Sequence, residues 1–226
     1  MLIAAAVCPP SPLLVPQVAQ GAAGELAGLR AACERAVDGL AASGADTVAV
    51  VGCGGADRVH GPDAAGGLEA YGVPLRVGEG PPVLPLPLTV GRWLCERVGL
   101  RPDRYVEVAA AAAPRECAER GADLAAAADR VALLVMGDGS ARNGEYAPGT
   151  ADERAPEFDA AVARALAGAD TAALERVEPA LAEELMCGGR AAWQVLAGAA
   201  KGAGLCGDLL AHEAPYGVGY FAALWR

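Results

Sequence analysis

Residues 47–55 read Thr47-Val48-Ala49-Val50-Val51-Gly52-Cys53-Gly54-Gly55. The first five are small or β-branched residues, which is typical of a strand buried on both faces, and the glycines end it. Before this strand, residues 17–42 repeat apolar side chains at helical spacing, and Ser43-Gly44 ends that predicted helix. Residues 2–7 form another continuous apolar run. Strand, helix and strand in this order predict parallel strands joined by a covering helix.

The same alternation continues through the rest of the chain, with no internal repeat and no linker that would divide it. A chain of 226 residues suits one domain with its own core. We therefore expect one α/β domain over residues 1–226, in which helices cover both faces of a central, mostly parallel sheet. Further strands are predicted at 73–77, 105–109, 131–136 and 217–225. Further helices are predicted at 89–98, 116–129, 158–167, 171–184 and 190–202.

The charge of the chain excludes several classes of partner. Its 18 basic and 28 acidic residues give a net charge of -10, and no run of basic residues occurs. Nucleic acids and anionic membranes attract cationic proteins, so neither is expected as a partner. No apolar stretch reaches the roughly 18 to 20 residues of a membrane-spanning helix, and the apolar N-terminus lacks the basic flank of a signal peptide. We expect a cytoplasmic protein that binds a small molecule, and assembly into a homo-oligomer stays open.

Cysteine and histidine counts limit the chemistry further. Seven cysteines, an odd number without a Cys-x-x-Cys pair, argue against a disulfide framework and against a zinc knuckle. Cys33, Cys95 and Cys117 fall in predicted helices, where we expect small buried apolar side chains. The chain has only two histidines, His60 and His212. Chemistry that needs several imidazoles therefore has little to use.

Five segments, spread over almost the whole chain, form a recognisable series. They are Cys8-Pro9-Pro10-Ser11-Pro12-Leu13-Leu14-Val15-Pro16, Ala45-Asp46-Thr47-Val48-Ala49-Val50-Val51-Gly52, Val135-Met136-Gly137-Asp138-Gly139-Ser140, Met186-Cys187-Gly188-Gly189-Arg190 and Tyr216-Gly217-Val218-Gly219-Tyr220. In this order they resemble the class III extradiol ring-cleavage dioxygenase B-subunit superfamily, which includes the Memo-like proteins. The resemblance implies one domain of this superfamily over residues 1–226, with its site at the ends of the strands.

In that superfamily the resemblance implies Fe(II) held by two histidines and a carboxylate, with open positions for the catecholate and O2. Here the first ligand position falls at Pro10, the second at Gly54, and the acid/base histidine at Ala141. None of these side chains has a donor atom, and only Cys187, at the last position, retains one. We therefore expect a degenerate metal site and no cofactor, with Fe(II) or Zn(II) bound only if the ancestral activity survives.

The two histidines leave an alternative open. His60 follows the second strand in a glycine-rich stretch, and His212 precedes the predicted closing strand. Together with Glu213 or Asp208 they could form a new facial triad, and His60 and Cys187 are the weak candidates for metal ligands. Three hypotheses therefore stand: an iron-free protein that binds a small organic or anionic ligand, a genuine metal-dependent ring-cleavage dioxygenase with a rearranged site, and a non-catalytic partner subunit.

Candidate site residues follow from the position of the strand ends, because ligands of open α/β sheets bind beyond the carboxyl ends of the strands. Asp138 and Ser140 could orient a hydroxylated ligand, and Arg142 or Arg190 could clamp a carboxylate or phosphate. Cys187 precedes a predicted helix, whose dipole would favour a thiolate and thus a thiol-dependent activity. The catalytic candidates are Asp138, Ser140 and Cys187. The ligand-binding candidates are Pro10, Ser11, Cys53, Gly54, Arg142 and Arg190.

Overall fold

Seven strands form the central sheet of the computed structural model, which describes residues 1–226. They are β1 (Leu2–Cys8), β2 (Thr47–Gly54), β3 (Arg58–His60), β6 (Arg104–Ala109), β7 (Val131–Met136), β8 (Gly207–Glu213) and β9 (Tyr220–Trp225). Their order across the sheet is β3-β6-β2-β7-β1-β9-β8. The four strands β6, β2, β7 and β1 run parallel, while β3, β9 and β8 are antiparallel to their neighbours. The predicted mostly parallel sheet is confirmed.

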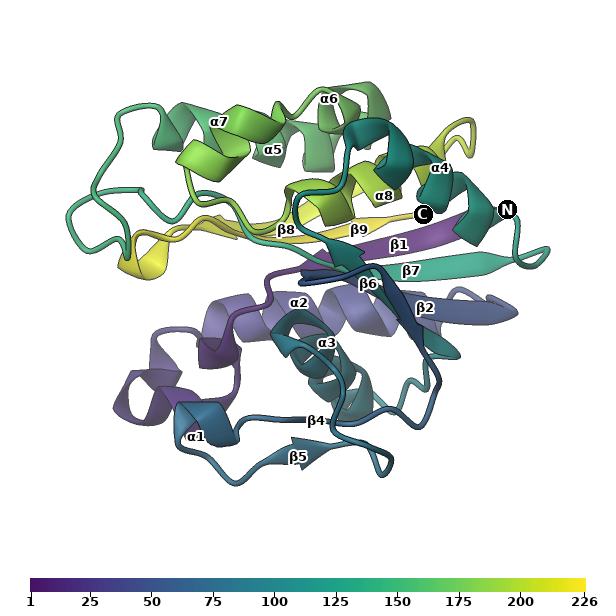
Figure 1. The fold of residues 1–226 in the computed structure, drawn as a ribbon, viewed down its shortest axis with the longest axis horizontal. Helices are drawn as coiled ribbons and strands as arrows, with labels where there is room; N and C mark the ends of the chain where they lie inside the picture. Colours follow the sequence, from purple (N-terminus) through teal and green to yellow (C-terminus); the bar gives the residue numbers. More distant parts are fainter.

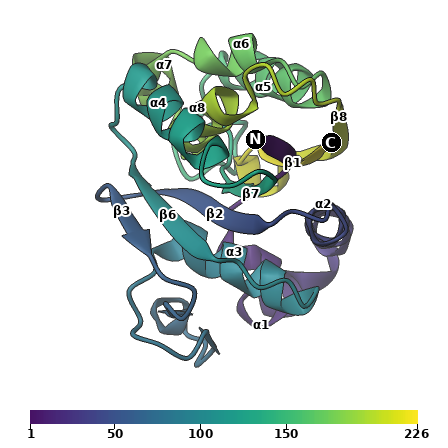
Figure 2. The ribbon, with the colours of Figure 1, turned by 90° about the vertical axis from the view of Figure 1, so that its right-hand side faces the viewer.

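Helices cover both faces of this sheet, as Figures 1 and 2 show. One face carries α2 (Ala27–Ala41) and α3 (Leu86–Arg97), and the other carries α4 (Pro114–Ala125), α5 (Ala155–Ala167) and α8 (Arg190–Ala200). The short helices are α1 (Pro16–Ala19), α6 (Thr171–Glu175) and α7 (Pro179–Glu184), with 3-10 turns η1 (Pro12–Leu14), η2 (Gln20–Gly24), η3 (Glu69–Tyr71) and η4 (Pro215–Gly217). A separate two-stranded ribbon joins β4 (Gly66–Gly67) and β5 (Arg76–Val77). The result is a single α/β domain with a core on each side of the sheet.

Two glycines allow α4 and α8 to pack in close contact. A Cβ on Gly121 would lie 2.0 Å from the main-chain oxygen of Val195, and a Cβ on Gly198 would lie 2.1 Å from that of Ala118. Neither position can hold a side chain unless the helices separate. Part of the glycine content of the chain therefore serves helix packing over the sheet.

The single helix predicted over residues 171–184 is wrong, since the structure divides it into α6 and α7. Asp170 caps α6 by accepting a hydrogen bond from the Ala173 N–H, and Glu178 caps α7 in the same way from Leu181. Pro179 supplies no N–H, and proline is tolerated only in the first turn of a helix. The proline therefore starts a new helix instead of continuing the previous one.

The two ends of the chain also differ from the prediction. The helix predicted over 17–42 is interrupted at Gln20, which has a φ of 50°, so α1 and η2 precede α2. The closing strand begins at Tyr220 because Gly217, with a φ of 71°, forms part of the preceding turn. Strand β8 was not predicted at all.

No helix in the chain combines the length and the apolar character that crossing a membrane would need.

Candidate functional site

The carboxyl ends of the parallel strands meet at one edge of the sheet, where most of the predicted site residues lie. Strands β1 and β7 end side by side, since the Gly137 N–H donates to the Cys8 oxygen at 2.9 Å. Strand β9 is antiparallel and therefore begins at this edge, with Tyr220. The start of α8 is attached there through a hydrogen bond from the Gly189 N–H to the Asp138 main-chain oxygen, 2.9 Å long. We call Ser11, Cys53, Asp138, Cys187 and Tyr220 the strand-end site.

Asp138 carries the one carboxyl of this site, directly after β7. Its side chain is half-buried and forms no salt bridge or hydrogen bond with another side chain. Burial raises the pKa of Asp138 to about 6, although the main-chain N–H groups of Asp138 and Gly188 lower it, and the charge of Asp159 raises it further. A carboxyl with a pKa near neutrality can both accept and release a proton at physiological pH.

Tyr220 and Ser11 form a buried hydroxyl pair next to it. The Tyr220 hydroxyl donates to Ser11 Oγ at 3.0 Å, and the same oxygen accepts a hydrogen bond from the Leu13 N–H at 3.3 Å. Burial raises the pKa of Tyr220, the hydrogen bond to Ser11 lowers it, and the charge of Asp138 raises it. Tyr220 is therefore a neutral hydroxyl at physiological pH. In the sequence, Tyr220 is only part of the predicted closing strand. Its hydrogen bond with Ser11 in the folded chain brings its hydroxyl to the strand-end site.

The hydroxyl of Ser140, a catalytic candidate, already donates a hydrogen bond to a second buried carboxylate, that of Asp159. The main-chain N–H and the hydroxyl of Ser140 donate to the two oxygens of Asp159, at 2.8 and 2.7 Å, and Asn143 Nδ2 donates to the same carboxylate at 3.2 Å. Gly139 and Gly219 leave room for this carboxylate, since a Cβ on either would come within 2.5 Å of it. The hydroxyl of Ser140 holds the start of the following loop. Sequence reasoning missed Asp159, because it lies in an alanine-rich helix without any motif.

The two candidate arginines differ in the hydrogen bonds that their guanidinium groups form with the protein. Arg190 is buried, and its guanidinium donates to the main-chain oxygens of Ala110 and Ala112 and to Gln194 Oε1. These bonds attach α8 to the segment after β6, so the predicted clamp role of Arg190 has to be corrected. Arg142 has a buried Nε without a hydrogen-bond partner. Arg190 is therefore tied to the protein itself by three hydrogen bonds, whereas the Arg142 Nε donates to no protein acceptor.

The two cysteines of the strand-end site, Cys53 and Cys187, are neutral thiols. Burial raises the pKa of Cys53 to about 11. Burial also raises the pKa of Cys187, and this outweighs the N–H groups of Gly189 and Arg190 at the start of α8, which lower it. The Cys187 thiol donates to the Asp138 main-chain oxygen at 3.3 Å. Burial therefore opposes the thiolate that the sequence predicts at this helix N-terminus.

The donor set at the strand ends does not fit the iron site that the resemblance implies. Pro10 and Ala141 have no donor atom, and a Cβ on Gly54 would lie 2.3 Å from Glu107 Oε1, so a histidine there would collide with this side chain. No three His, Cys, Asp or Glu side chains of the chain converge as a metal-binding group. We therefore derive no chemical step through a metal.

The two histidines lie on opposite edges of the sheet. His60 belongs to β3 and His212 to β8, which are separated by six interstrand spacings of about 4.8 Å, or about 29 Å in total. His60 is a buried strand residue, not a loop residue, and its Nε2 lies 3.3 Å from Glu107 Oε2. His212 is exposed and stacks on Phe221, with ring centroids 5.0 Å apart. A triad that uses both histidines is therefore excluded by the topology.

Comparison with known proteins adds a likeness in fold. No model of a known protein family matches the chain, and no curated protein sequence is similar to it. Among solved structures, the chain is similar to the crystal structure of the uncharacterized protein JW3007 from Escherichia coli K12. The similarity has a TM-score of 0.54 at 12% sequence identity and covers 99% of each chain. The two proteins therefore share the architecture over their whole lengths.

Proposed function

We propose that this chain is a divergent member of the class III extradiol dioxygenase superfamily whose strand-end site binds a small hydroxylated organic ligand without catalytic iron. The observation that carries the proposal is the Asp138 carboxyl. It is half-buried, has no side-chain partner, and lies after a central parallel strand. Ligand sites of α/β proteins form at such strand ends, and carboxyls with shifted pKa values concentrate at functional sites.

The superfamily assignment rests on the order of five motifs along the chain, and the α/β architecture is compatible with it. The absence of iron from the proposal rests on the chemistry of the donor positions. Pro10, Gly54 and Ala141 replace imidazoles with side chains that cannot ligate a metal. The protein would therefore bind its ligand at the location of the ancestral site without the redox step of the ancestral reaction.

The residues of the strand-end site have complementary tasks in ligand binding. Ionised Asp138 accepts a hydrogen bond from a ligand hydroxyl and, with its pKa of about 6, can take its proton. The neutral hydroxyl of Tyr220, fixed by Ser11, orients the polar end of the ligand. Arg142 carries positive charge in the loop that follows β7, where it attracts an anionic group on the ligand.

Anaerobic purification followed by metal analysis, O2 uptake and calorimetric titration tests the proposal. Catechol and 3,4-dihydroxybenzoate are the probes, since the resemblance points to dihydroxylated aromatic ligands. We expect saturable binding of 3,4-dihydroxybenzoate at neutral pH, no stoichiometric iron, and no O2 uptake. Asp138→Asn should weaken binding about tenfold, because it removes a charged hydrogen-bond acceptor.

The matched control is Asp123→Asn, which removes an exposed carboxyl on α4 and should leave the affinity unchanged. Stoichiometric iron together with ring cleavage would overturn the proposal in favour of a metal-dependent dioxygenase. Failure of both probes to bind would overturn it in favour of a non-catalytic partner subunit.

A further inference from the structure

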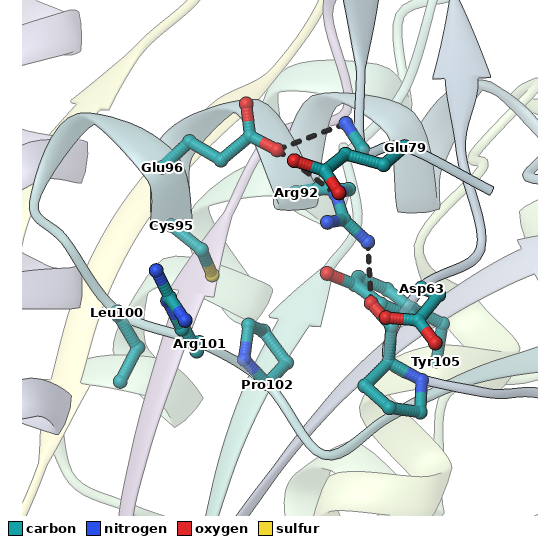
Figure 3. A pocket seen from close by; sticks show the side chains of 11 residues that line it. Asp63, Glu79, Arg92, Cys95, Glu96, Leu100, Arg101, Pro102 and Tyr105 are labelled. Carbon is teal, nitrogen blue, oxygen red and sulfur yellow. Dashed lines mark hydrogen bonds and ion pairs between the residues drawn. The ribbon is translucent and has the colours of Figure 1, made fainter.

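A cavity of about 570 Å³ lies far from the strand-end site, against the face of the sheet that α3 covers (Figure 3). Its lining comes from the second half of α3, the turn that follows it, and the loops around Pro62 and Gly78. Tyr105, at the start of β6, also lines the cavity and so places it toward the amino ends of the parallel strands. The volume is within the range of about 300 to 1,000 Å³ that is typical of small-molecule sites.

Arg92 lies among these lining residues (Figure 3), and several hydrogen bonds fix its guanidinium. Its Nε donates to Glu96 Oε1 at 2.9 Å, and its Nη1 donates to the main-chain oxygens of Pro62 and Ala64 at 2.6 and 2.7 Å. The guanidinium also stacks over Tyr105, 5.5 Å from the ring centroid. The hydrogen bonds that fix Arg92 use Nε and Nη1, which leaves Nη2 as the guanidinium nitrogen for a ligand.

Unpaired charges of opposite sign lie on the two sides of Arg92. Figure 3 shows Arg101 on one side, near Cys95, and Glu79 and Asp63 on the other. All three charged side chains belong to exposed residues, and none forms a salt bridge. The Arg92–Glu96 pair is neutral as a unit, so the cavity offers a positive side and a negative side.

The remaining lining is uncharged. Cys95 is buried, and burial raises its pKa to about 12, so the sulfur stays a neutral thiol. Leu100 and Pro102 add apolar surface beside it. A ligand that fits this cavity therefore carries both charges at its polar end and an apolar portion next to Cys95.

We propose that this cavity is a second binding site, for a zwitterionic molecule of the amino-acid class with an apolar side chain. The carboxylate of the ligand binds Arg92 Nη2 and Arg101, and its ammonium group binds Asp63 and Glu79. A phosphate would be repelled by Asp63 and Glu79, and a divalent cation would be repelled by Arg101, whose charge no carboxylate neutralises. Only a ligand that carries both charges satisfies both sides.

The test is a calorimetric titration of the full chain with the proteinogenic amino acids and with leucylleucine. We expect at least one apolar amino acid or the dipeptide to bind at millimolar concentration or below. Its N-acetyl derivative lacks the ammonium group and its amide lacks the carboxylate, so each should bind about tenfold more weakly. Arg101→Ala and Glu79→Gln should each cause a loss of the same size in the affinity for the unmodified ligand.

Two control variants separate binding in this cavity from nonspecific binding and from binding at the strand-end site. Arg115→Ala removes an exposed arginine on α4 and should leave binding unchanged. Asp138→Asn should also leave it unchanged, because the strand-end site is not involved. Absence of binding by every compound in the panel would overturn the proposal. Equal binding of the capped derivatives, or unchanged binding in both Arg101→Ala and Glu79→Gln, would overturn it as well.

Discussion

The Cys187 thiol donates a hydrogen bond to the main-chain oxygen of Asp138, 3.3 Å away. The two residues are separated by 49 positions in the sequence. The contact joins the segment after β7 to the segment before α8 and holds the Asp138 carboxyl at the strand ends. The Gly189 N–H donates to the same oxygen at 2.9 Å, so two hydrogen bonds fix the main chain of Asp138 beside the proposed ligand site.

The stability of the protein should depend on the ionisation of Asp138. Its pKa is raised by burial to about 6 in the folded protein, whereas the unfolded chain has an ordinary carboxyl. Ionised Asp138 therefore lowers the free energy of unfolding. This loss is complete above about pH 6 and disappears as the pH falls toward about 4. Asp138→Asn should raise the free energy of unfolding by about 2 kcal/mol at about pH 8 and hardly change it at about pH 4. Urea titrations at both pH values measure the difference, with Asp123→Asn as control; equal effects at the two pH values would contradict it.

Asp159 should be one of the most important polar residues for stability. Its carboxylate accepts three hydrogen bonds, from the Ser140 N–H, the Ser140 hydroxyl and Asn143. Asp159→Ala leaves these donors without a partner, two of them buried, which should cost about 3 kcal/mol of unfolding free energy. Asp170→Ala, which removes only the cap of α6, should cost about 1 kcal/mol. Similar losses in the two variants would contradict the role given to Asp159.

Alanine substitution of two helix glycines should change the free energy of unfolding in opposite directions. Gly121→Ala places a Cβ 2.0 Å from the Val195 oxygen, so it should lower the free energy of unfolding by at least about 2 kcal/mol. Gly28, in α2, has no atom within 4 Å of the position that a Cβ would take. Gly28→Ala should therefore raise stability by about 0.5 kcal/mol. A Gly121→Ala variant with an unchanged free energy of unfolding would show that α4 and α8 pack less closely than described.

Thiol labelling should distinguish a neutral Cys187 from an activated one. Cys206 is exposed, whereas Cys187 is half-buried with a raised pKa. A disulfide reagent at neutral pH should modify about one thiol per chain rapidly, and Cys206→Ser should abolish this reaction because only an accessible thiolate attacks. A fast reaction that survives in Cys206→Ser and disappears in Cys187→Ser would contradict the neutral thiol.

Much of the fold was predictable because its central strands are continuous apolar runs. Strand β7 begins and ends where residues 131–136 predicted it, since a strand buried on both faces leaves no other pattern. Strand β8 was missed because its residues are mostly half-exposed and it lies at the sheet edge, paired only with β9. The apolar spacing of residues 171–184 predicts one continuous helix and does not reveal the break that Pro179 imposes.

The candidate site could be predicted in position but only partly in composition. Asp138 was found because it directly follows a central strand. Asp159 and Tyr220 come 21 and 82 positions after Asp138, and only tertiary structure brings them to the strand ends. The use of Arg190 was hidden for the same reason, since its acceptors at Ala110 and Ala112 reach it only in the folded chain.

One measurement tests the central claim most directly: calorimetric titration of the chelator-treated protein with 3,4-dihydroxybenzoate, repeated after addition of Fe(II) under anaerobic conditions. An iron-free site built around Asp138 predicts saturable binding to the chelator-treated protein, with an affinity that Fe(II) does not change and that Asp138→Asn weakens about tenfold. Binding that appears only after Fe(II) is added, and that Asp138→Asn leaves intact, would contradict the account.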